Sequence, residues 1–295
     1  MKILLLGCRG QLGWELQRSL APLGEVLALD AGSPGPGGDF TQPEALAATV
    51  RSVAPQVIVN AAAYTAVDRA ESEPALAHQI NAAGPALLAR EAERLGAWLL
   101  HYSTDYVFDG QGSRPWTEAD APAPLNVYGR SKLEGEQAVR AHGQHLLLRS
   151  SWLHGPRGDN FARTMLRLAG EREVLSVVDD QVGAPTGADL LADLSAHALR
   201  AALARPSLAG LYHVCAQGET SWHGYAAHVI GQARQRHPER VLKVRELRPV
   251  PSSGYPTPAR RPLNSRLDCR RFEQAFGLRL PAWQAGVDRL LAELC

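Results

Sequence analysis

The stretch KILLLGCRGQLG, residues 2–13, decides the fold of this 295-residue chain. Residues 2–6 form a short and nearly continuous apolar run, which is typical of a strand buried on both faces of a parallel sheet. A glycine turn follows, and a helical pattern of leucines at positions 12, 16 and 20 begins at once. A strand, a glycine turn and a helix in this order can hold a pyrophosphate, because glycines let the backbone approach and the helix amino terminus supplies free N–H groups.

The turn carries its glycines at Gly7, Gly10 and Gly13, in the spacing GxxGxxG. This spacing resembles that of the short-chain dehydrogenases more than the GxGxxG of lactate-type dehydrogenases. A second apolar run, residues 26–29, ends in Asp30, twenty residues beyond Gly10. A carboxylate at that place can accept hydrogen bonds from the hydroxyls of an adenine ribose, so the sequence predicts a dinucleotide site.

Strand and helix signals alternate along the first half of the chain. Beyond a Gly/Pro-rich loop at 31–39, the expected elements are helices from about 43 and over 74–95, and strands over 56–60, 98–103 and 145–149. Regular alternation of this kind predicts an α/β fold with a doubly wound parallel sheet of the Rossmann type, whose ligands bind at the carboxyl ends of the strands. We expect a dinucleotide-binding domain over 1–150. A smaller, mostly C-terminal substrate domain is expected over 151–295, with segments that return to the first domain.

Tyr128 and Lys132 stand four residues apart, a spacing that places a phenol and an ammonium on one face of a helix. The pKa of a phenol is near ~10 in water, so it exchanges a proton readily at neutral pH only if its anion is stabilised, as a cation one helical turn away can do. Thr104, at the end of a predicted strand, can hydrogen-bond the same substrate oxygen. These three residues are the predicted catalytic set. An exposed cation beside an aromatic ring, and a simple strand cap at Thr104, are the structural alternatives.

The composition limits the partners of the chain. Its 31 basic and 30 acidic residues give a net charge of +1, which favours neither nucleic acid nor an anionic membrane surface. No apolar stretch reaches the length that spans a bilayer. The four cysteines lie far apart and form no CxxC pair, which is typical of reduced thiols in a cytoplasmic protein; they are Cys8, Cys215, Cys269 and Cys295.

Six strings extend these patterns into a resemblance to a known family. They are GCRGQLGWEL from Gly7, NAAAYTAVDRAE from Asn60, STDYVFDG from Ser103, YGRSKLEGE from Tyr128, DDQVGAPTG from Asp179 and YPTPARRPLNSRL from Tyr255. Together they resemble the dTDP-4-dehydrorhamnose reductases, from the first residue to about residue 267. The resemblance implies a Rossmann-domain reductase that delivers a hydride from NADPH or NADH to the 4-keto group of a dTDP-linked 6-deoxyhexose. Its product would be dTDP-L-rhamnose, a precursor of cell-wall polysaccharide and O-antigen.

The resemblance also implies the residues of the site. The cofactor residues would be Gly10, Gln11 and Leu12 at the pyrophosphate, Asp30, Asp39 and Phe40 at the adenosine, and Ala63, Tyr64, Thr65 and Tyr102 along the remainder. Thr104, Asp105 and Trp152 would face the sugar. Tyr128 would be the proton donor, and Lys132 would hold the nicotinamide ribose. For Phe40, Tyr102 and Trp152 a buried aromatic ring without a ligand is the ordinary alternative.

A basic segment near the carboxyl terminus offers guanidinium groups suited to a diphosphate, at Arg260, Arg261 and Arg266. A basic loop in solvent is the alternative. Asp30 disfavours the 2′-phosphate of NADPH, but Arg9 lies close enough in sequence to favour it, so the sequence leaves NADH and NADPH open.

Some members of the family carry a divalent metal ion at a dimer interface. Glu15, Asp189 and Asp193 match its ligand positions, and the resemblance therefore implies a homodimer with a magnesium site. A solvated helix face is the alternative for these carboxylates.

Two other functions fit the same fold. One is a nucleotide-sugar epimerase or dehydratase, which keeps its cofactor bound and regenerates it. The other is a non-catalytic NADP-binding regulatory subunit, like the beta subunits of some methionine adenosyltransferases. The intact set of Tyr128, Lys132 and Thr104 argues against the second.

Overall fold

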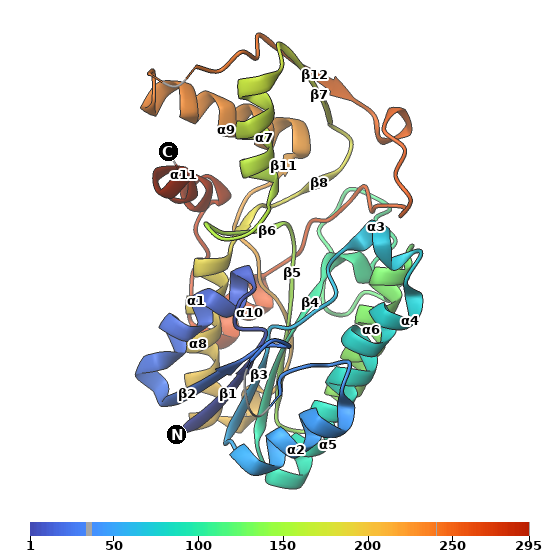
Figure 1. Cartoon of the computed structure of the whole chain (residues 1–295), viewed down its shortest axis with the longest axis vertical. Helices are drawn as coiled ribbons and strands as arrows, with labels where there is room; N and C mark the ends of the chain where they lie inside the picture. The colour runs from blue at the N-terminus through green and yellow to red at the C-terminus, as the bar shows by residue number, and fades with distance from the viewer. Residues whose placement is uncertain (34–36, 240, 295) are drawn as a thin grey trace.

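The computed structural model describes residues 1–33, 37–239 and 241–294. Part of the predicted Gly/Pro-rich loop and Cys295 lie outside the described residues. Figure 1 shows a larger unit, in which helices flank a central sheet, and a smaller unit of helices and short strands beyond one end of that sheet.

A parallel sheet of six strands forms the centre of the larger unit, in the order β10-β5-β4-β3-β1-β2 (Figure 1). Its strands are β1 (Lys2–Leu6), β2 (Glu25–Leu29), β3 (Val57–Asn60), β4 (Trp98–Thr104), β5 (His145–Ser150) and β10 (Gly210–His213). The chain runs outward from β1 to β2 and then returns to the other side of β1 at β3, so the strand order reverses there. The prediction of a doubly wound parallel sheet is confirmed. A reversal of this kind leaves a crevice for ligands at the carboxyl ends of the strands.

Helices cover both faces of the sheet. One face carries α1 (Gln11–Leu20) and α8 (Ala188–Ala204), and the other carries α2 (Pro43–Val53), α5 (Gly84–Leu95) and α6 (Val127–Arg140) (Figure 1). Side chains alternate along a strand, so Ile3 and Leu5 enter the core beneath α1 and α8, whereas Leu4 and Leu6 enter the core beneath α2 and α5. This double burial is why β1 reads as a continuous apolar run.

The smaller unit has its own apolar core. It contains α7 (Phe161–Glu171), α9 (Trp222–Arg236) and α11 (Trp283–Leu294), with the strand pairs β7 (Val174–Val178) with β12 (Glu246–Val250), β8 (Val182–Gly183) with β11 (Thr220–Ser221), and β6 (Leu153–His154) with β9 (Thr186–Gly187). The chain beyond residue 150 also contributes to the larger unit, because α8 packs on α1, β10 extends the main sheet beside β5, and α10 (Arg270–Phe276) packs on β10.

Three short helices connect β3 to α5 and place residues beside the crevice. They are α3 (Val67–Ala70), α4 (Pro74–His78) and a single π-helical turn, Gln79–Ala83. The turn ends where α5 begins, and a π turn inside a helix often marks a functional site.

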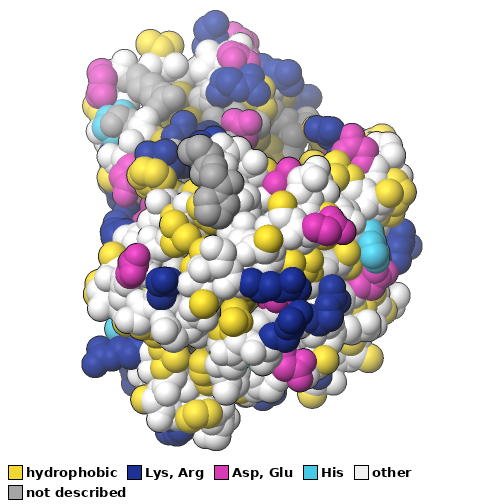
Figure 2. Space-filling model, turned by 60° about the horizontal axis from the view of Figure 1, so that its bottom comes forward, with side chains coloured by type: hydrophobic (Ala, Val, Ile, Leu, Met, Phe, Trp, Pro, Cys, Tyr) yellow, Lys and Arg dark blue, Asp and Glu magenta, His cyan; other side chains and the backbone are white. Residues whose placement is uncertain are grey.

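The surface and the thiols show no unusual chemistry in the described part of the chain. On the face shown in Figure 2, acidic side chains lie among the basic ones, although several basic side chains gather near its centre. None of the helices in the described ranges combines the length and the apolar character that a membrane crossing requires. The described cysteines, Cys8, Cys215 and Cys269, are free thiols, and the Sγ atoms of Cys215 and Cys269 are 3.4 Å apart.

Candidate active site

The glycine turn lies at the point where the strand order reverses. Gly7 has φ +83°, and a Cβ on it would lie 2.5 Å from the main-chain nitrogen of Ala62, in the loop after β3. A Cβ on Gly13 would lie 2.0 Å from the carbonyl oxygen of Gly7. Side chains at these two positions would therefore force the turn away from the sheet. Gly10 precedes α1 as its N-cap and provides no side-chain cap, so the N–H groups of the first helical turn, beginning at Gln11, are not capped by it.

Asp30 lies at the end of β2, where the sequence places it. Its carboxylate accepts hydrogen bonds from the Gly32 N–H (2.9 Å) and the Ser33 hydroxyl (3.2 Å), and forms an ion pair with Arg9 Nε at 2.8 Å. Arg9 is largely exposed, with 73% of its side chain accessible. The anionic group that suits a ribose and the cationic group that suits a 2′-phosphate therefore lie side by side.

Asp39 and Phe40 occupy the other predicted adenosine positions. The Asp39 carboxylate accepts two 2.8 Å hydrogen bonds from Thr41, one from its N–H and one from its hydroxyl. The ring of Phe40 is buried and packs so tightly on α5 that a Cβ on Gly84 would lie 2.1 Å from it. Phe40 thus belongs to the core, and its side chain supports the loop from behind.

The loop after β3 contains Ala63, Tyr64 and Thr65 and is held by a residue that the sequence did not single out. The amide of Asn81, in the π-helical turn, accepts from the Tyr64 N–H (2.8 Å) and donates to the Tyr64 carbonyl oxygen (3.0 Å). It also donates to the Ser131 hydroxyl on α6 at 3.1 Å. The phenol of Tyr64 donates to the Glu73 carboxylate. No sign of this role for Asn81 is present in the sequence, because its position in a π-helical turn is known only from the structure.

Tyr128 and Lys132 lie on the first turns of α6, as predicted. Asn126 caps this helix, because its side-chain oxygen accepts a 2.7 Å hydrogen bond from the Gly129 N–H. The side chain of Lys132 is buried, and its Nζ donates to the carbonyl oxygen of Tyr102 on β4 at 2.6 Å. The ring of Tyr128 meets the ring of Tyr106 edge to face, with centroids 5.5 Å apart.

The surroundings shift the pKa values of these two groups in ways that suit proton donation. Burial raises the pKa of Tyr128 to about 12, and a hydrogen bond from Thr104 acts in the opposite direction. Burial lowers the pKa of Lys132 to about 8, although attraction to the nearby Glu136 carboxylate acts against this. At neutral pH the phenol therefore holds its proton, and most of the amine is charged. The structure brings Thr104, Tyr128 and Lys132 together.

Asp105 lies directly behind Thr104 and is almost completely buried. Its carboxyl group accepts a hydrogen bond from the Thr104 hydroxyl at 3.1 Å. Burial raises the pKa of Asp105 to about 6, and hydrogen bonds from Ser265 and Thr104 act in the opposite direction. Its second oxygen has no hydrogen-bond partner in the described part of the chain, so it is the one atom of the group left for another ligand.

The side chains of Tyr102 and Trp152, both predicted to contact a ligand, have different surroundings. The phenol of Tyr102 points into the core and donates to the Ser195 hydroxyl of α8 at 2.8 Å, so only its backbone faces Lys132. Trp152 has φ +48° and stacks on Trp222, with ring centroids 3.7 Å apart. The indole N–H of Trp222 donates to the side-chain oxygen of Gln181 at 3.1 Å. Trp222 and Gln181 were missed in the sequence because no local spacing joins them to Trp152.

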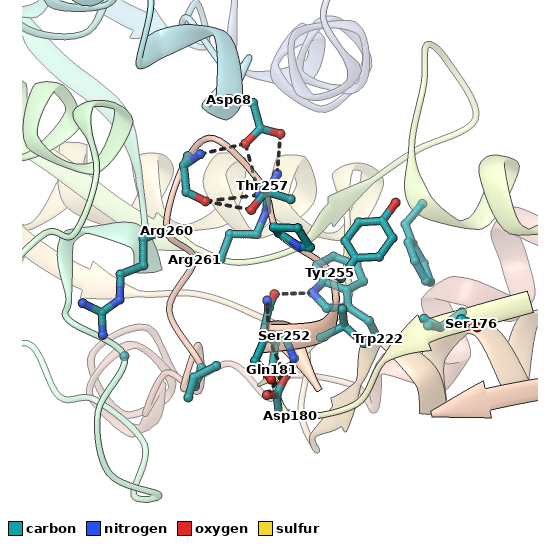
Figure 3. Close-up of a pocket in the computed structure, with 18 of the residues that line it drawn as sticks. Asp68, Ser176, Asp180, Gln181, Trp222, Ser252, Tyr255, Thr257, Arg260 and Arg261 are labelled. Atoms are coloured by element: carbon teal, nitrogen blue, oxygen red, sulfur yellow. Dashed lines mark hydrogen bonds and ion pairs between the residues drawn. The ribbon is translucent and has the colours of Figure 1, made fainter. Parts of the chain in front are cut away.

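A cavity of about 1480 Å³ lies between the two units and is shown in Figure 3. Asp68 and residues 109–112 line it from the larger unit, and residues of α7, β7 and the segment 252–261 line it from the smaller one. Arg260 and Arg261, two of the residues predicted at the diphosphate, both line the cavity. Arg266 does not line it, because its guanidinium is bound to the Glu219 carboxylate at 2.6 Å. The cavity exceeds the usual size of a small-molecule site and can hold an extended ligand.

The predicted metal ligands are not brought together as a set. Glu15 and Asp189 share a small cavity of about 20 Å³ with His154 and Glu293, two residues that the sequence did not single out. The Nε of Arg289 lies 3.2 Å from the Asp189 carboxylate and 3.5 Å from that of Glu293, so a protein cation already neutralises this pair.

Asp193 lies outside that cavity. Its carboxylate accepts hydrogen bonds from Arg18 (2.9 Å) and from the Ser19 hydroxyl, and Arg18 also contacts Glu15 at 3.4 Å. Across residues 1–33, 37–239 and 241–294, no group of three or more carboxylate, histidine or cysteine side chains could hold a metal ion. Within the described part of one chain Glu15, Asp189 and Asp193 thus form no complete ligand set, because arginines engage their carboxylates, and the magnesium site at a dimer interface stays a prediction.

A buried ion pair joins α6 to strand β5 of the sheet. Glu136, one turn beyond Lys132, binds Arg149 of β5 through two hydrogen bonds of 2.8 and 2.6 Å, and each side chain is only 1% exposed. Two fully buried opposite charges must remain paired, since an unpaired buried charge is costly. The pair thus fixes the helix that carries Tyr128 and Lys132 against the strand beside β4.

Comparison with known proteins agrees with this geometry over the whole chain. The family model described as the RmlD substrate binding domain matches residues 1–295. The chain is 57% identical to the dTDP-4-dehydrorhamnose reductase of Escherichia coli strain K12, over 100% of this chain and 98% of that protein.

Two solved structures match it closely. One is a dTDP-4-dehydrorhamnose reductase of Clostridium acetobutylicum, with a TM-score of 0.89 and 34% identity over 100% of this chain and 99% of that one. The other is the Bacillus anthracis enzyme of the same name in complex with NADP, with a TM-score of 0.87 and 36% identity over 99% of each chain. Because the family model and these relatives match it from end to end, this protein belongs to the dTDP-4-dehydrorhamnose reductase family.

Proposed function

We propose that the protein reduces the 4-keto group of dTDP-4-dehydro-6-deoxy-L-mannose (dTDP-4-dehydrorhamnose) with NADPH or NADH, and that the product is dTDP-L-rhamnose. The observation that carries this proposal is the set of Thr104, Tyr128 and buried Lys132 at the carboxyl end of the sheet. None of the three lines the cavity, which is large enough for a nucleotide sugar and is lined by nearby segments such as residues 109–112. The name of the Escherichia coli relative, which is 57% identical over the whole chain, supports the same reaction.

The residues present fit a dinucleotide. The main chain packs so closely at Gly7 and Gly13 that neither position has room for a Cβ, and a tight glycine turn of this kind is what a pyrophosphate requires. Asp30 can accept hydrogen bonds from the ribose hydroxyls. The proposed cofactor contacts are those of the sequence prediction: Gly7, Gly10, Gln11, Leu12, Gly13, Asp30, Asp39, Phe40, Ala63, Tyr64, Thr65, Tyr102, Tyr128 and Lys132. For Phe40 and Tyr102 the buried rings leave the main chain as the contacting part. When bound, the nicotinamide supplies the hydride.

The chemistry of the chain itself is the transfer and stabilisation of one proton. As C4 of the sugar receives the hydride, the Tyr128 phenol donates its proton to the carbonyl oxygen, and Thr104 donates a hydrogen bond to the same oxygen. The charged Lys132 stabilises the phenolate that remains. A raised pKa of Tyr128 keeps the proton available over the whole neutral range. General acid catalysis of this kind contributes about 10²- to 10⁴-fold, and positioning contributes more.

The remainder of the substrate would lie in the cavity. Arg260 and Arg261 line it and offer donors for a diphosphate. Trp152 and Asp105, which do not line the cavity, would contact the sugar at its inner end. The chain would act as a homodimer, and the proposed chemistry runs through its own side chains without magnesium.

The test is reduction of dTDP-4-keto-6-deoxy-L-lyxo-hexose with NADPH and with NADH. One cofactor molecule should be oxidised for each keto-sugar consumed, and the product should be dTDP-L-rhamnose. The free 4-keto-6-deoxy sugar should be reduced orders of magnitude more slowly in kcat/KM, because remote binding energy orients the reacting carbon. Cofactor retained through purification, with no net oxidation, would instead favour an epimerase or dehydratase. A stable complex with a methionine adenosyltransferase and no ketone reduction would favour the regulatory subunit.

A further inference from the structure

Asp68 joins the two units at the mouth of the cavity. It lies on α3 of the larger unit, and its partners lie in residues 257–261, the part of the cavity wall that we call the strap (Figure 3). Its Oδ1 accepts from the Ala259 N–H at 3.1 Å and from Arg261 Nη1 at 3.1 Å, and its Oδ2 accepts from Arg261 Nη2 at 2.8 Å. One carboxylate therefore holds both the backbone and the guanidinium of the strap.

The strap is also tied within itself. The Thr257 hydroxyl donates to the carbonyl oxygen of Ala259 at 2.9 Å, and Arg261 Nη1 lies 3.4 Å from the same oxygen. Asp68 contacts this turn from outside the strap, and its geometry with Arg261 is the paired fork that fixes a guanidinium plane. The Arg261 guanidinium lowers the pKa of the Asp68 carboxyl, so the pair is charged at neutral pH.

The pair contributes little to stability as an ion pair, because the Arg261 and Asp68 side chains are 24% and 38% exposed and water screens the attraction. Its effect is on orientation. The Asp68 carboxylate uses two of the five N–H donors of Arg261 and the Ala259 carbonyl oxygen uses a third, which leaves two for an anion in the cavity that both residues line. Arg260, by contrast, extends away from Asp68 in Figure 3.

Arg261 also reaches toward the reacting group. Burial raises the pKa of the Tyr106 phenol, the positive charge of Arg261 acts to lower it, and the ring of Tyr106 meets that of Tyr128 edge to face. The carbonyl oxygen of Arg260 accepts a 2.8 Å hydrogen bond from Asn126, the residue that caps the helix of Tyr128. A strap held in place by Asp68 is therefore continuous with the elements that position the proton donor.

We propose that Asp68 is a positioning residue for the substrate: it holds the strap at the mouth of the cavity and orients Arg261 toward the diphosphate. This inference rests on the proposed function. If Asp68 only neutralised Arg261, its carboxylate would compete with the diphosphate, and its removal would tighten binding. The bond to the Ala259 N–H argues for positioning, because loss of Asp68 frees the strap backbone as well as the guanidinium.

The experiment compares Asp68→Ala and Asp68→Asn with Glu219→Ala, a matched control. Glu219 binds Arg266 through two similar hydrogen bonds of 2.6 and 3.3 Å. Arg266 lies only five residues beyond Arg261, but neither Arg266 nor Glu219 lines the cavity. We expect Asp68→Ala to raise the KM for the dTDP-sugar, and the Kd for dTDP measured by calorimetry, about tenfold, as loss of preorganisation of one side chain implies. The KM for NADPH should stay within about twofold. Asp68→Asn retains an acceptor for the Ala259 N–H and should show a smaller loss, and Glu219→Ala should show none.

A double-mutant cycle separates positioning from a general structural role. In an Arg261→Ala background, Asp68→Ala should cost less than in the wild type, because the part of its effect that passes through Arg261 is already lost. An equal loss in both backgrounds, or tighter binding of dTDP by Asp68→Ala or Asp68→Asn, would overturn the inference. Should Asp68→Ala fold poorly, Asp68→Asn gives the same two comparisons. A wild-type protein that neither binds dTDP nor reduces its keto-sugar would overturn the proposed function itself, whereas an active wild type with an unaffected Asp68→Ala would reject this inference alone.

Discussion

The Nζ of Lys132 donates a 2.6 Å hydrogen bond to the main-chain carbonyl oxygen of Tyr102. Lys132 belongs to α6, whereas Tyr102 belongs to β4, two residues before that strand ends in Thr104. The bond therefore ties the helix of the proton donor to the strand that carries the hydroxyl partner. An ammonium has three donors, so this contact leaves others for a ribose hydroxyl near the phenol.

Replacement of Tyr128 by phenylalanine tests the proton donor. Tyr128→Phe removes the phenolic proton but keeps the ring that packs on Tyr106. We expect kcat to fall by at least about two orders of magnitude, because general acid catalysis is lost. Cofactor affinity, measured by fluorescence titration with NADPH, should change little. Wild-type turnover in this variant would remove Tyr128 from the mechanism.

The pKa of Lys132 predicts the alkaline limit of activity. Burial lowers this pKa to about 8, so the ammonium loses its proton as pH rises through that value and no longer stabilises the phenolate. The pKa of Tyr128, about 12, leaves the phenol protonated throughout this range. We expect kcat/KM for ketone reduction to fall above about pH 8. The control is Lys132→Arg, whose cation persists to much higher pH; a fall near pH 8 in that variant as well would assign the titration to another group.

The Arg9–Asp30 pair predicts how the cofactor is chosen. Asp30→Ala removes an acceptor for the 2′-hydroxyl of NADH, and Arg9→Ala removes a donor for the 2′-phosphate of NADPH. We expect the first change to raise the KM for NADH, and the second the KM for NADPH, each about tenfold, as one lost charged hydrogen bond implies. The measurement is the ratio of kcat/KM for the two cofactors. A ratio that neither change moves would place selection elsewhere.

The buried pair of Glu136 and Arg149 predicts a large effect on stability. Glu136→Gln leaves the Arg149 guanidinium, which is 1% exposed, without its counter-charge. We expect the free energy of unfolding to fall by about 3–5 kcal/mol, the usual result of breaking a buried pair. Denaturant unfolding measures this. The matched control is Glu134→Gln, because Glu134 lies on the same helix with 50% of its side chain exposed and should cost less than about 0.5 kcal/mol. Equal losses in the two variants would contradict the expectation.

The arginine contacts of Glu15, Asp189 and Asp193 predict insensitivity to chelators. Arg18 binds Glu15 and Asp193, and Arg289 binds Asp189, so protein cations already neutralise these carboxylates. We expect EDTA to leave the melting temperature and the sedimentation coefficient unchanged. A fall in melting temperature that added Mg²⁺ reverses would restore the magnesium site, with ligands drawn from a second copy of the chain.

Much of the fold could be predicted because its signals are local. The run at residues 2–6 is apolar throughout since β1 is buried on both faces, and the glycine turn and α1 follow within a few residues. The spacing of Tyr128 and Lys132 needed only one helical turn to bring the two side chains together. The position of Asp30 could be predicted because it directly follows an apolar run and lies about twenty residues beyond the glycine turn, as the acidic residue of a dinucleotide-binding motif does.

Other features depend on contacts between segments that are far apart in the chain. Strand β4 sends Trp98, Leu100 and Tyr102 to one face, so the Tyr102 phenol meets Ser195 of α8 instead of a ligand. Asp193 is four residues from Asp189, but Arg18 and Ser19 of α1 draw its carboxylate away from the small cavity. No pattern in the sequence indicates that Tyr102 contacts Ser195 or that Asp193 contacts Arg18 and Ser19.

The sequence alone thus determined the order of strands and helices, the glycine turn and the phenol–ammonium pair, because each arises from residues a few positions apart. Only the tertiary structure decided that Glu136 pairs with Arg149, and that Asp68 pairs with Arg261 across 193 positions of sequence. Such pairs form when packing brings buried or confined charges within hydrogen-bonding distance, and local spacing carries no record of which distant segments will meet.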